Sequence, residues 1–335
     1  MAPAVHASQN IYDDPAVFDC YSTFPRSQHG LDTAKGGAPE WPVLKQIVLG
    51  DGNDSSNQNS IERTMLRGSK VLDLGCGYGW FCRWVRDEVG AEEVVGIDIS
   101  ERMLARARNF GSRPFPFPSN SHPHAQEEKR KENEATIVHD EDTRIRYERG
   151  DLETIRLSDL SGGAEDVYDL IYSSLSFHYI SDFRRLAKEI STVLKPGGKL
   201  VFSIEHPIFT APREAEWKML KKKGSDLGTY VENQGESHTD LDPDPLPIWP
   251  LNAYSTEGLR LTAWLGMENV RKYHRTTATY ITSLLEAGLE LTHLVDWAPS
   301  EELMRTNPKW AVHCERPMFM LVGARKRDHL SCTIE

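Results

Sequence analysis

Residues 70–79 read Lys-Val-Leu-Asp-Leu-Gly-Cys-Gly-Tyr-Gly and indicate how the fold begins. Its first five residues form a short apolar run that predicts a buried strand. Glycines at alternate positions then let the backbone turn sharply and approach a ligand closely. Apolar residues at helical spacing follow from Phe81 to Val89, and Gly90 ends that segment. A strand, a glycine-rich turn and a helix predict the first unit of an open α/β sheet, which binds ligands beyond the carboxyl ends of its strands.

Strand-like and helix-like segments alternate along the rest of the chain. The expected strands are residues 94–98, 145–147, 168–172, 199–204, 289–297 and 318–322. Ser100 is expected to cap one helix, and Asp182 to begin another that ends at 195–198. A further helix is expected over 276–287. This alternation predicts a parallel sheet with helices on both faces.

Three stretches read as insertions into this core. Residues 50–60 are rich in Gly, Asn and Ser and predict a mobile loop. Residues 113–142 are polar and charged and predict disorder, because they cannot bury an apolar face. Residues 224–250 are proline-rich and predict an extended loop or lid. The resulting division is a cap segment with its loop at 1–60, one domain at 61–330 with insertions at 111–142 and 205–254, and a tail at 331–335.

Charge and composition restrict the partners. The formal net charge of −11 over 335 residues gives no long-range attraction toward phosphate backbones or anionic membranes, so we expect neither nucleic acid nor membrane as a partner. The lone basic triplet at 221–223 is read as a solvated loop. With no secretory signal in residues 1–10 and no apolar run of spanning length, the chain is expected to be cytoplasmic.

Cysteines and histidines give no metal-binding pattern. The five cysteines include no CxxC spacing, which predicts a reduced compartment with neither a disulfide framework nor a zinc site. His122, His124 and His139 fall in the charged insertion and are read as solvated. We therefore expect no metal.

Two acidic residues indicate the kind of ligand. Asp98 ends the second strand nineteen residues after Gly79, where a carboxylate can accept hydrogen bonds from ribose hydroxyls. A dinucleotide would fit so far, but Trp80 occupies the place of the third fingerprint glycine. Asp73, just before the turn, would repel a pyrophosphate at the following helix N-terminus. The same carboxylate attracts an ammonium and a sulfonium, which favours S-adenosylmethionine. A turn or helix cap is the structural alternative for Asp73.

Five motifs resemble, in the same order, those of the class I S-adenosylmethionine-dependent methyltransferases. They are VLDLGCGYG (71–79), VVGIDIS (94–100), ERGDLE (148–153), YDLIYSSLSFHYI (168–180) and VLKPGGKLVFSIEHPI (193–208). The segments 11–31, 264–276, 294–300 and 316–326 resemble a small-molecule, type 11/25-like subgroup. The resemblance implies a Rossmann-like, seven-stranded, mostly parallel sheet with an antiparallel last strand and inserted lid segments. It also implies methyl transfer from S-adenosyl-L-methionine to a small-molecule acceptor, with S-adenosyl-L-homocysteine as product.

The resemblance also assigns cofactor-binding roles by position. The residues expected around the methionine portion are Asp73, Gly75, Cys76, Gly77 and Gly79. Those expected around the adenosine are Asp98, which holds the ribose, Ile99, Met103, Asp151 and Leu152. Those expected beside the methyl group are Ser173, Ser174 and Leu175. A covering N-terminal segment contributes Tyr12, Tyr21 and Arg26, with plain packing as the alternative for the two tyrosines.

Histidines at strand ends are the candidates for a general base. His178 follows the fourth strand, and His206 follows the fifth. His274 lies in the C-terminal part of the chain. We expect at least one within reach of the methyl group, in a pocket closed by residues 12–26 and 249–276, and a structural role is the alternative for each. Arg275 is expected to pair either with an acceptor carboxylate or with an acid of the core.

Two further points bound the function. Residues 173–176 read Ser-Ser-Leu-Ser, which lacks the Asn/Asp-Pro-Pro-aromatic motif of enzymes that methylate exocyclic amines of bases or glutamine. The sequence leaves open a regulatory or non-methylating protein that binds S-adenosylmethionine. It fixes neither the acceptor nor the oligomeric state.

Overall fold

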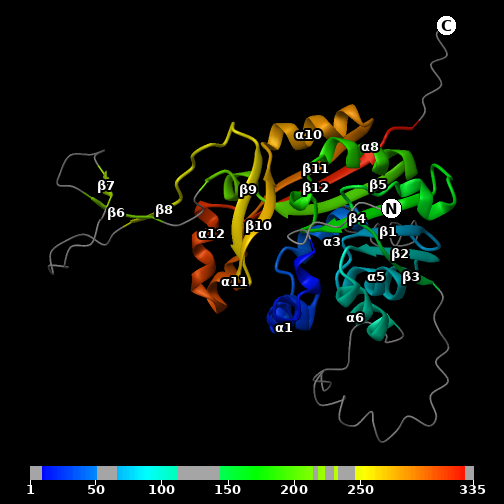
Figure 1. Cartoon of the computed structure of the whole chain (residues 1–335), viewed down its shortest axis with the longest axis horizontal. Coiled ribbons are helices and arrows are strands. Elements are labelled where there is room, and N and C mark those ends of the chain that lie inside the picture. Colours follow the sequence, from blue (N-terminus) through cyan, green and yellow to red (C-terminus); the bar gives the residue numbers. More distant parts are fainter. Residues whose placement is uncertain are drawn as a thin grey trace, which may run out of the picture.

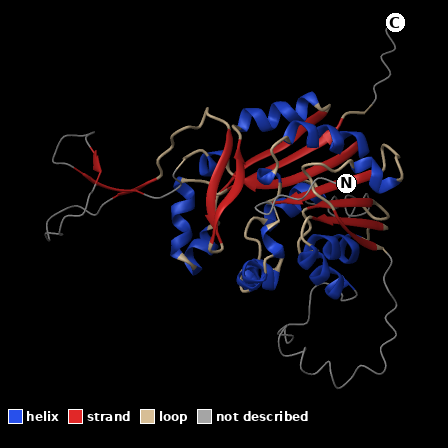
Figure 2. Cartoon of the chain, in the orientation of Figure 1, coloured by secondary structure: helices blue, strands red, loops and turns tan. Residues whose placement is uncertain are grey.

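The computed structural model describes residues 10–50, 66–111, 144–213, 218–222, 230–232 and 246–328. A seven-stranded sheet forms its centre, in the order β11-β12-β5-β4-β1-β2-β3 (Figures 1 and 2). The strands are β1 (Lys70–Leu74), β2 (Glu93–Asp98), β3 (Ile145–Arg149), β4 (Tyr168–Ser174), β5 (Leu194–Glu205), β11 (Leu289–Trp297) and β12 (Phe319–Lys326). Strands β1 to β5 pair in parallel, and β12 runs antiparallel to both β5 and β11. This confirms the expected fold and its antiparallel last strand.

Helices cover both faces of the sheet, and each face has its own apolar core. On one face lie α8 (Phe183–Val193) and α10 (Thr277–Glu286), whose buried side chains pack on the inward residues of β1, β4 and β5. On the other lie α3 (Trp41–Leu49), α5 (Trp80–Trp84) and α6 (Glu101–Gly111). The central strands β1, β2 and β4 are therefore buried on both faces, as their near-continuous apolar runs predict, whereas the edge strands β3 and β11 are partly exposed.

The predicted helix starts are confirmed by their capping bonds. The side chain of Asp182 accepts from the backbone amide of Arg185, and that of Thr276 accepts from Thr279. Ser100 caps α6 through its hydroxyl, which accepts from Met103 N at 3.2 Å. These bonds satisfy amide groups that a helix N-terminus otherwise leaves unpaired.

Several boundaries differ from the expectation. The helix expected over 81–89 divides into α5 and a π-helical turn, η3 (Val85–Val89), before Gly90 takes a left-handed conformation. Residues 195–198, expected to end a helix, belong to β5, because α8 already ends at Val193. The last strand continues to Lys326, where it still pairs with Leu289 of β11.

Two smaller sheets flank the main one. The hairpin of β9 (Gly258–Trp264) and β10 (Met267–His274) packs through β10 against η5 (Phe177–Tyr179) and α9 (Pro207–Thr210). The other sheet joins β6 (Lys218–Lys222), β7 (Tyr230–Glu232) and β8 (Leu246–Ile248). The expectation of a basic loop at 221–223 is therefore wrong, because Lys221 and Lys222 belong to a strand that pairs with β7. The lid expected at 224–250 likewise contains β7 and β8.

The N-terminal segment precedes the sheet and is made of short helices. They are η1 (Ile11–Asp13), α1 (Pro15–Ser22), α2 (Pro25–His29) and η2 (Thr33–Lys35). The remaining short helices are η4 (Leu157–Ser161), α11 (Glu301–Thr306), η6 (Pro308–Ala311) and α12 (Val312–Glu315). None of the helices in the described ranges is both long and apolar enough to span a bilayer.

Some expectations fall on other parts of the chain. The loop at 50–60 apart from Gly50, the insertion at 113–142 with its three histidines, and the tail at 331–335 lie outside the described residues.

Candidate active site

A cavity of about 370 Å³ lies at the carboxyl ends of the parallel strands. Its walls come from the ends of β1, β2, β4 and β5, from the N-terminal segment and from the β9–β10 hairpin. Its volume falls in the range that small-molecule sites occupy. Because the strand order is β5-β4-β1-β2, the cavity has one end near Asp98 of β2 and another near Glu205 of β5.

The glycine-rich turn after β1 forms the floor of the first end. Gly75, Gly77 and Gly79 have φ angles of 80°, 52° and 67°, which side chains rarely adopt. A Cβ on Gly75 would lie 1.9 Å from Oγ of Ser176, and one on Gly79 would lie 2.1 Å from the hydroxyl of Tyr147. A Cβ on Gly77 would have no atom within 4 Å, and Gly77 lines the cavity. Gly77 therefore leaves space for a ligand, whereas the other two allow close packing within the protein.

The carboxylate of Asp98 is fixed at the end of β2 by two backbone amides. Gly77 N donates to Oδ2 at 2.8 Å, and Ser100 N donates to Oδ1 at 2.9 Å. Burial raises the pKa of Asp98 to about 6, although these amide hydrogen bonds act to lower it. Each oxygen keeps a second lone pair, so the carboxylate can still accept from a ligand in the cavity.

Asp73 lies buried at the same end, beneath the glycine turn. The thiol of Cys82 donates to its Oδ2 at 3.3 Å, and burial raises the pKa of Asp73 to about 7. The amides of Gly75 and Cys76, which a capping carboxylate would engage, donate instead to the carbonyl of Ile97. This arrangement disfavours the capping alternative, and Asp73 lines the cavity.

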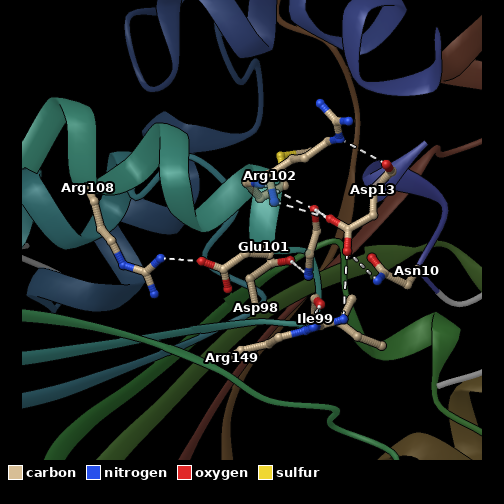
Figure 3. A network of polar contacts seen from close by, with 10 residues as sticks. Asn10, Asp13, Asp98, Ile99, Glu101, Arg102, Arg108 and Arg149 are labelled. Carbon is tan, nitrogen blue, oxygen red and sulfur yellow. Dashed lines mark hydrogen bonds and ion pairs between the residues drawn. The ribbon is translucent and has the colours of Figure 1, made fainter. Parts of the chain in front are cut away.

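Asp13 attaches the N-terminal segment to the start of α6, beside Asp98 (Figure 3). Its Oδ1 accepts from Ser100 Oγ at 2.7 Å and from Arg102 N at 3.2 Å, and its carbonyl accepts from Arg102 Nε at 2.9 Å. Arg149 Nη2 lies 3.7 Å from Oδ2 of Asp13. These contacts hold η1 over the cavity. In the sequence, the adjacent acids Asp13 and Asp14 are the only sign of this role.

Tyr12, Tyr21 and Arg26 line the cavity from the N-terminal segment. Trp264 Nε1 of the hairpin donates to the Tyr12 hydroxyl at 3.2 Å, and the Tyr12 and Tyr21 rings meet edge-on at 5.1 Å between centroids. Nη2 of Arg26 lies 2.6 Å from each carboxylate oxygen of Glu40, whose side chain is fully buried. The segment thus covers the cavity, and Glu40 fixes the position of the arginine.

Glu205, the last residue of β5, forms the other end of the cavity with His178. Its Oε1 lies 2.5 Å from Nζ of Lys272, while its Oε2 is buried and has no hydrogen-bond partner in the described part of the chain. Burial acts to raise the pKa of Glu205, but the charges of protonated His178, of Lys272 and of Arg316 outweigh it, and the pKa is lowered. Lys272 is buried, with Nζ 5.4 Å from the centroid of the Trp264 ring.

Of the three candidate histidines, only His178 reaches the cavity. Its Nδ1 accepts from Glu205 N at 3.4 Å, and burial lowers its pKa to about 4. His206 is directed to the other side, because successive residues of a strand alternate, and its Nε2 lies 2.8 Å from Asp296. His274 uses both ring nitrogens, at 2.9 Å from Thr210 Oγ1 and 2.8 Å from the carbonyl of Tyr254. Neither His206 nor His274 lines the cavity.

The remaining predicted residues divide into two groups. Those that line the cavity are Cys76, Ile99, Met103, Asp151, Leu152, Ser174 and Leu175. Gly79 and Ser173 do not line the cavity. Gly79 is the N-cap of α5, and Ser173 Oγ donates to the carbonyl of Leu74 at 2.7 Å. Arg275 does not line the cavity and, among the described residues, does not pair with an acid of the core. Its guanidinium donates to the carbonyls of Ile180 and Ser181.

Sequence reasoning missed four residues around this cavity: Asp13, Glu40, Glu205 and Lys272. Glu205 had a readable signal, because it is an acid at a strand end, as Asp98 is. The described residues hold no group of three or more His, Cys, Asp or Glu side chains placed to bind a metal ion.

Comparison with known proteins identifies the family to which the chain belongs. Residues 57–294 match the model of a family described as methyltransferase domain. An uncharacterized protein of Haemophilus influenzae is 30% identical over 268 residues, which cover 78% of this chain and 82% of that protein. The solved structure of an S-adenosylmethionine-dependent methyltransferase from Mesorhizobium loti is 34% identical, with a TM-score of 0.60, covering 89% of this chain and 100% of that one.

A third relative shares a smaller part. The malonyl-[acyl-carrier protein] O-methyltransferase of Erwinia billingiae is 29% identical over 157 residues, which are 47% of each chain. The match therefore spans about half the length of that enzyme.

Proposed function

This chain belongs to the methyltransferase domain family and binds S-adenosylmethionine, and we propose that it transfers the methyl group of this cofactor to a small molecule held between Glu205 and the glycine-rich turn. The observation that supports this most is that one cavity has two chemically different ends. One end offers Gly77 and the carboxylate of Asp98, and the other offers Glu205 and His178. A donor and an acceptor can then lie side by side.

The residues at the first end fit S-adenosylmethionine. The open space at Gly77 admits a ligand against the backbone, and the spare lone pairs of Asp98 suit the two ribose hydroxyls. Ile99 and Met103 supply apolar contact for the adenine, with Asp151 and Leu152 at its edge. Asp73 offers a carboxylate to the positively charged methionine portion, and Arg26 offers a guanidinium to its carboxylate. These assignments are our proposal for the cofactor-binding residues.

When bound, S-adenosylmethionine supplies a methyl group on a positively charged sulfur, and the nucleophilic atom of the acceptor displaces that sulfur in line. The protein contributes chiefly alignment, which can lower such a barrier by about 7–11 kcal/mol. In this proposal Tyr12 and Tyr21, which line the cavity, limit the access of water to the bound methyl group. Exclusion of water strengthens every electrostatic contact that the walls make.

His178 acts in this proposal as a hydrogen-bond donor rather than as a base. Burial lowers its pKa to about 4, so the ring is neutral near pH 7. Because Nδ1 accepts the amide proton of Glu205, the neutral ring carries its proton on Nε2. A ring in this state can orient an acceptor atom but has no free lone pair with which to remove a proton.

A substitution at the acceptor end tests this function. The His178→Ala variant should lower turnover while leaving the affinity for S-adenosylhomocysteine within a few-fold, because His178 acts on the acceptor. His274→Ala, outside the cavity, serves as the matched control and should keep turnover per folded molecule. If both variants kept wild-type turnover on an acceptor, the assignment of His178 would be withdrawn.

A further inference from the structure

We propose that the methyl acceptor is an amine, whose nitrogen is held by Oε2 of Glu205; this rests on the proposed function of the same cavity. Neither the motif resemblance nor the comparisons assign a role to Glu205 or to Lys272. The inference comes from how the charges at this end of the cavity are arranged.

The Glu205–Lys272 pair leaves one carboxylate oxygen for a ligand. Lys272 lies behind Glu205, does not line the cavity, and engages Oε1 at 2.5 Å. Oε2 is buried and lacks a hydrogen-bond donor among the described residues, although a buried acceptor is normally paired. The ammonium of Lys272 therefore keeps the carboxylate charged and oriented, while Oε2 has the capacity to accept from a bound N–H group.

The surrounding walls favour a ligand that carries positive charge. Glu205 is the charged residue of this end. Among the described residues that line the cavity, Arg26 is the one Lys or Arg, and its guanidinium is already paired with Glu40. The rings of Tyr12, Tyr179 and Trp264 line the same region. Aromatic faces attract cations, as the ring of Trp264 already does with Lys272. A carboxylate acceptor would instead meet the negative charge of Glu205.

The reaction balances for an amine without a proton acceptor in the protein, because the ammonium form gives one proton to water and the free base is the form that reacts. The lone pair of the free amine forms the N–CH₃ bond while the S–CH₃ bond breaks, and the electron pair of that bond goes to sulfur. The positive charge lost by sulfur appears on nitrogen as an ammonium, which loses its proton to water after release. Glu205 faces the nitrogen on which this charge develops, so its contact strengthens along the reaction.

An alcohol acceptor would need a base that this end lacks. An alcohol must lose its proton as the O–CH₃ bond forms, or it yields an oxonium ion. The free lone pair of His178 is already used by the amide of Glu205. Glu205 itself is held in its charged form by Lys272, and a carboxylate with a lowered pKa is a weak base toward an alcohol.

Matched probes test the proposal with the full-length protein. Each of three skeletons, 2-phenylethyl, 2-(indol-3-yl)ethyl and n-hexyl, is offered as its amine, its alcohol and its one-carbon-longer carboxylate. Binding is measured by calorimetry with S-adenosylhomocysteine present, and methylation by mass spectrometry with S-adenosylmethionine. We expect at least one amine to bind tenfold or more tightly than its alcohol and carboxylate partners, and to yield the N-methyl product.

Glu205→Gln removes the charge and keeps the shape, so it should lower the affinity for that amine by tenfold or more. Its affinity for S-adenosylhomocysteine should stay within twofold of wild type. Glu268→Gln, at an exposed position of β10, is the matched control and should change neither value. Thermal unfolding identifies a variant that fails to fold. In that case the preference of the wild-type protein for amine over alcohol and carboxylate probes decides the proposal.

The proposal is overturned if no amine outcompetes its partners in any skeleton, or if a folded Glu205→Gln variant keeps the wild-type affinity for the preferred amine. Methylation of alcohols or carboxylates in preference would overturn the amine assignment and leave the methyltransferase function intact. A protein that failed to bind S-adenosylhomocysteine at all would contradict the proposed function itself.

Discussion

The backbone amide of Gly77 donates to the carboxylate of Asp98 at 2.8 Å, which joins the glycine-rich turn after β1 to the end of β2. The second oxygen of Asp98 accepts from Ser100 N at 2.9 Å, at the start of α6. Asp98 therefore both shapes the turn and presents its remaining lone pairs to the cavity. Substitution at this position should affect the ligand more than the fold.

Asp98→Ala should weaken binding of S-adenosylhomocysteine sharply. Two ribose hydroxyls lose a charged acceptor, and hydrogen bonds to charged groups contribute about 1.5–3 kcal/mol each. Calorimetry gives the dissociation constant, and circular dichroism confirms that the sheet is retained. An unchanged dissociation constant would remove Asp98 from the ribose site.

Cofactor affinity should fall as the pH drops through about 6. Burial raises the pKa of Asp98 in the free protein to about 6. Only the ionised carboxylate accepts from both hydroxyls, so bound ligand lowers this pKa and affinity is lost as the proton returns. We expect a dissociation constant that is flat above pH 7 and rises below pH 6.

The Asp98→Asn variant is the control for this titration. It should bind weakly at every pH and should lose the component that titrates near pH 6. Any slope that remains nearer pH 7 belongs to Asp73, whose pKa burial raises to about 7. A wild-type affinity that stayed constant from pH 8 to pH 5 would contradict the ionised role of Asp98.

Gly77→Ala should impair binding more than stability. A left-handed conformation costs a non-glycine residue roughly 1–2 kcal/mol, but the added methyl group meets no protein atom within 4 Å. It would stand in the space that the ligand needs. Gly75→Ala is the contrasting variant, because its methyl group would collide with Ser176 and should lower the melting temperature further. Equal cofactor affinity in wild type and Gly77→Ala would show that the ligand does not approach this turn.

Arg26→Ala should destabilise the protein as well as weaken cofactor binding. It leaves the carboxylate of Glu40 buried without its ion-pair partner, a change that costs about 3–5 kcal/mol in comparable buried pairs. Denaturant unfolding measures the loss. The double variant Arg26→Met/Glu40→Leu should recover most of the stability but not the affinity for S-adenosylhomocysteine. Recovery of both would mean that Arg26 serves packing alone.

The order of strands and helices could be predicted because it depends on local patterns. Apolar runs, Ser100 and Asp182 as caps, and the glycine turn each act within a few residues, and the structure confirms them. The π-helical turn at 85–89 could not be predicted, because the apolar spacing of that segment also fits an ordinary helix. The early start of β5 was missed because Pro196 and the following glycines usually interrupt a strand.

The candidate site was predictable only where it depends on strand ends. Proximity to a strand end made both His178 and His206 candidates, but it could not separate them, since the alternation of side chains directs Glu205 inward and His206 toward Asp296. Lys272 comes from a distant hairpin, and its approach to Glu205 depends on tertiary packing that no local pattern encodes. The partner of Arg26 was missed for the same reason.

The most direct test of the central claim follows the methyl group itself. Purified protein is incubated with S-adenosylmethionine labelled in its methyl group and with the amine acceptors, and S-adenosylhomocysteine and labelled product are quantified together. The account predicts that the two form in equal amounts, only when an acceptor is present, and that both fall sharply in Asp98→Ala. Tight binding of S-adenosylmethionine without formation of S-adenosylhomocysteine, across amines, alcohols and carboxylates alike, would contradict it and would favour a non-methylating role for this cavity.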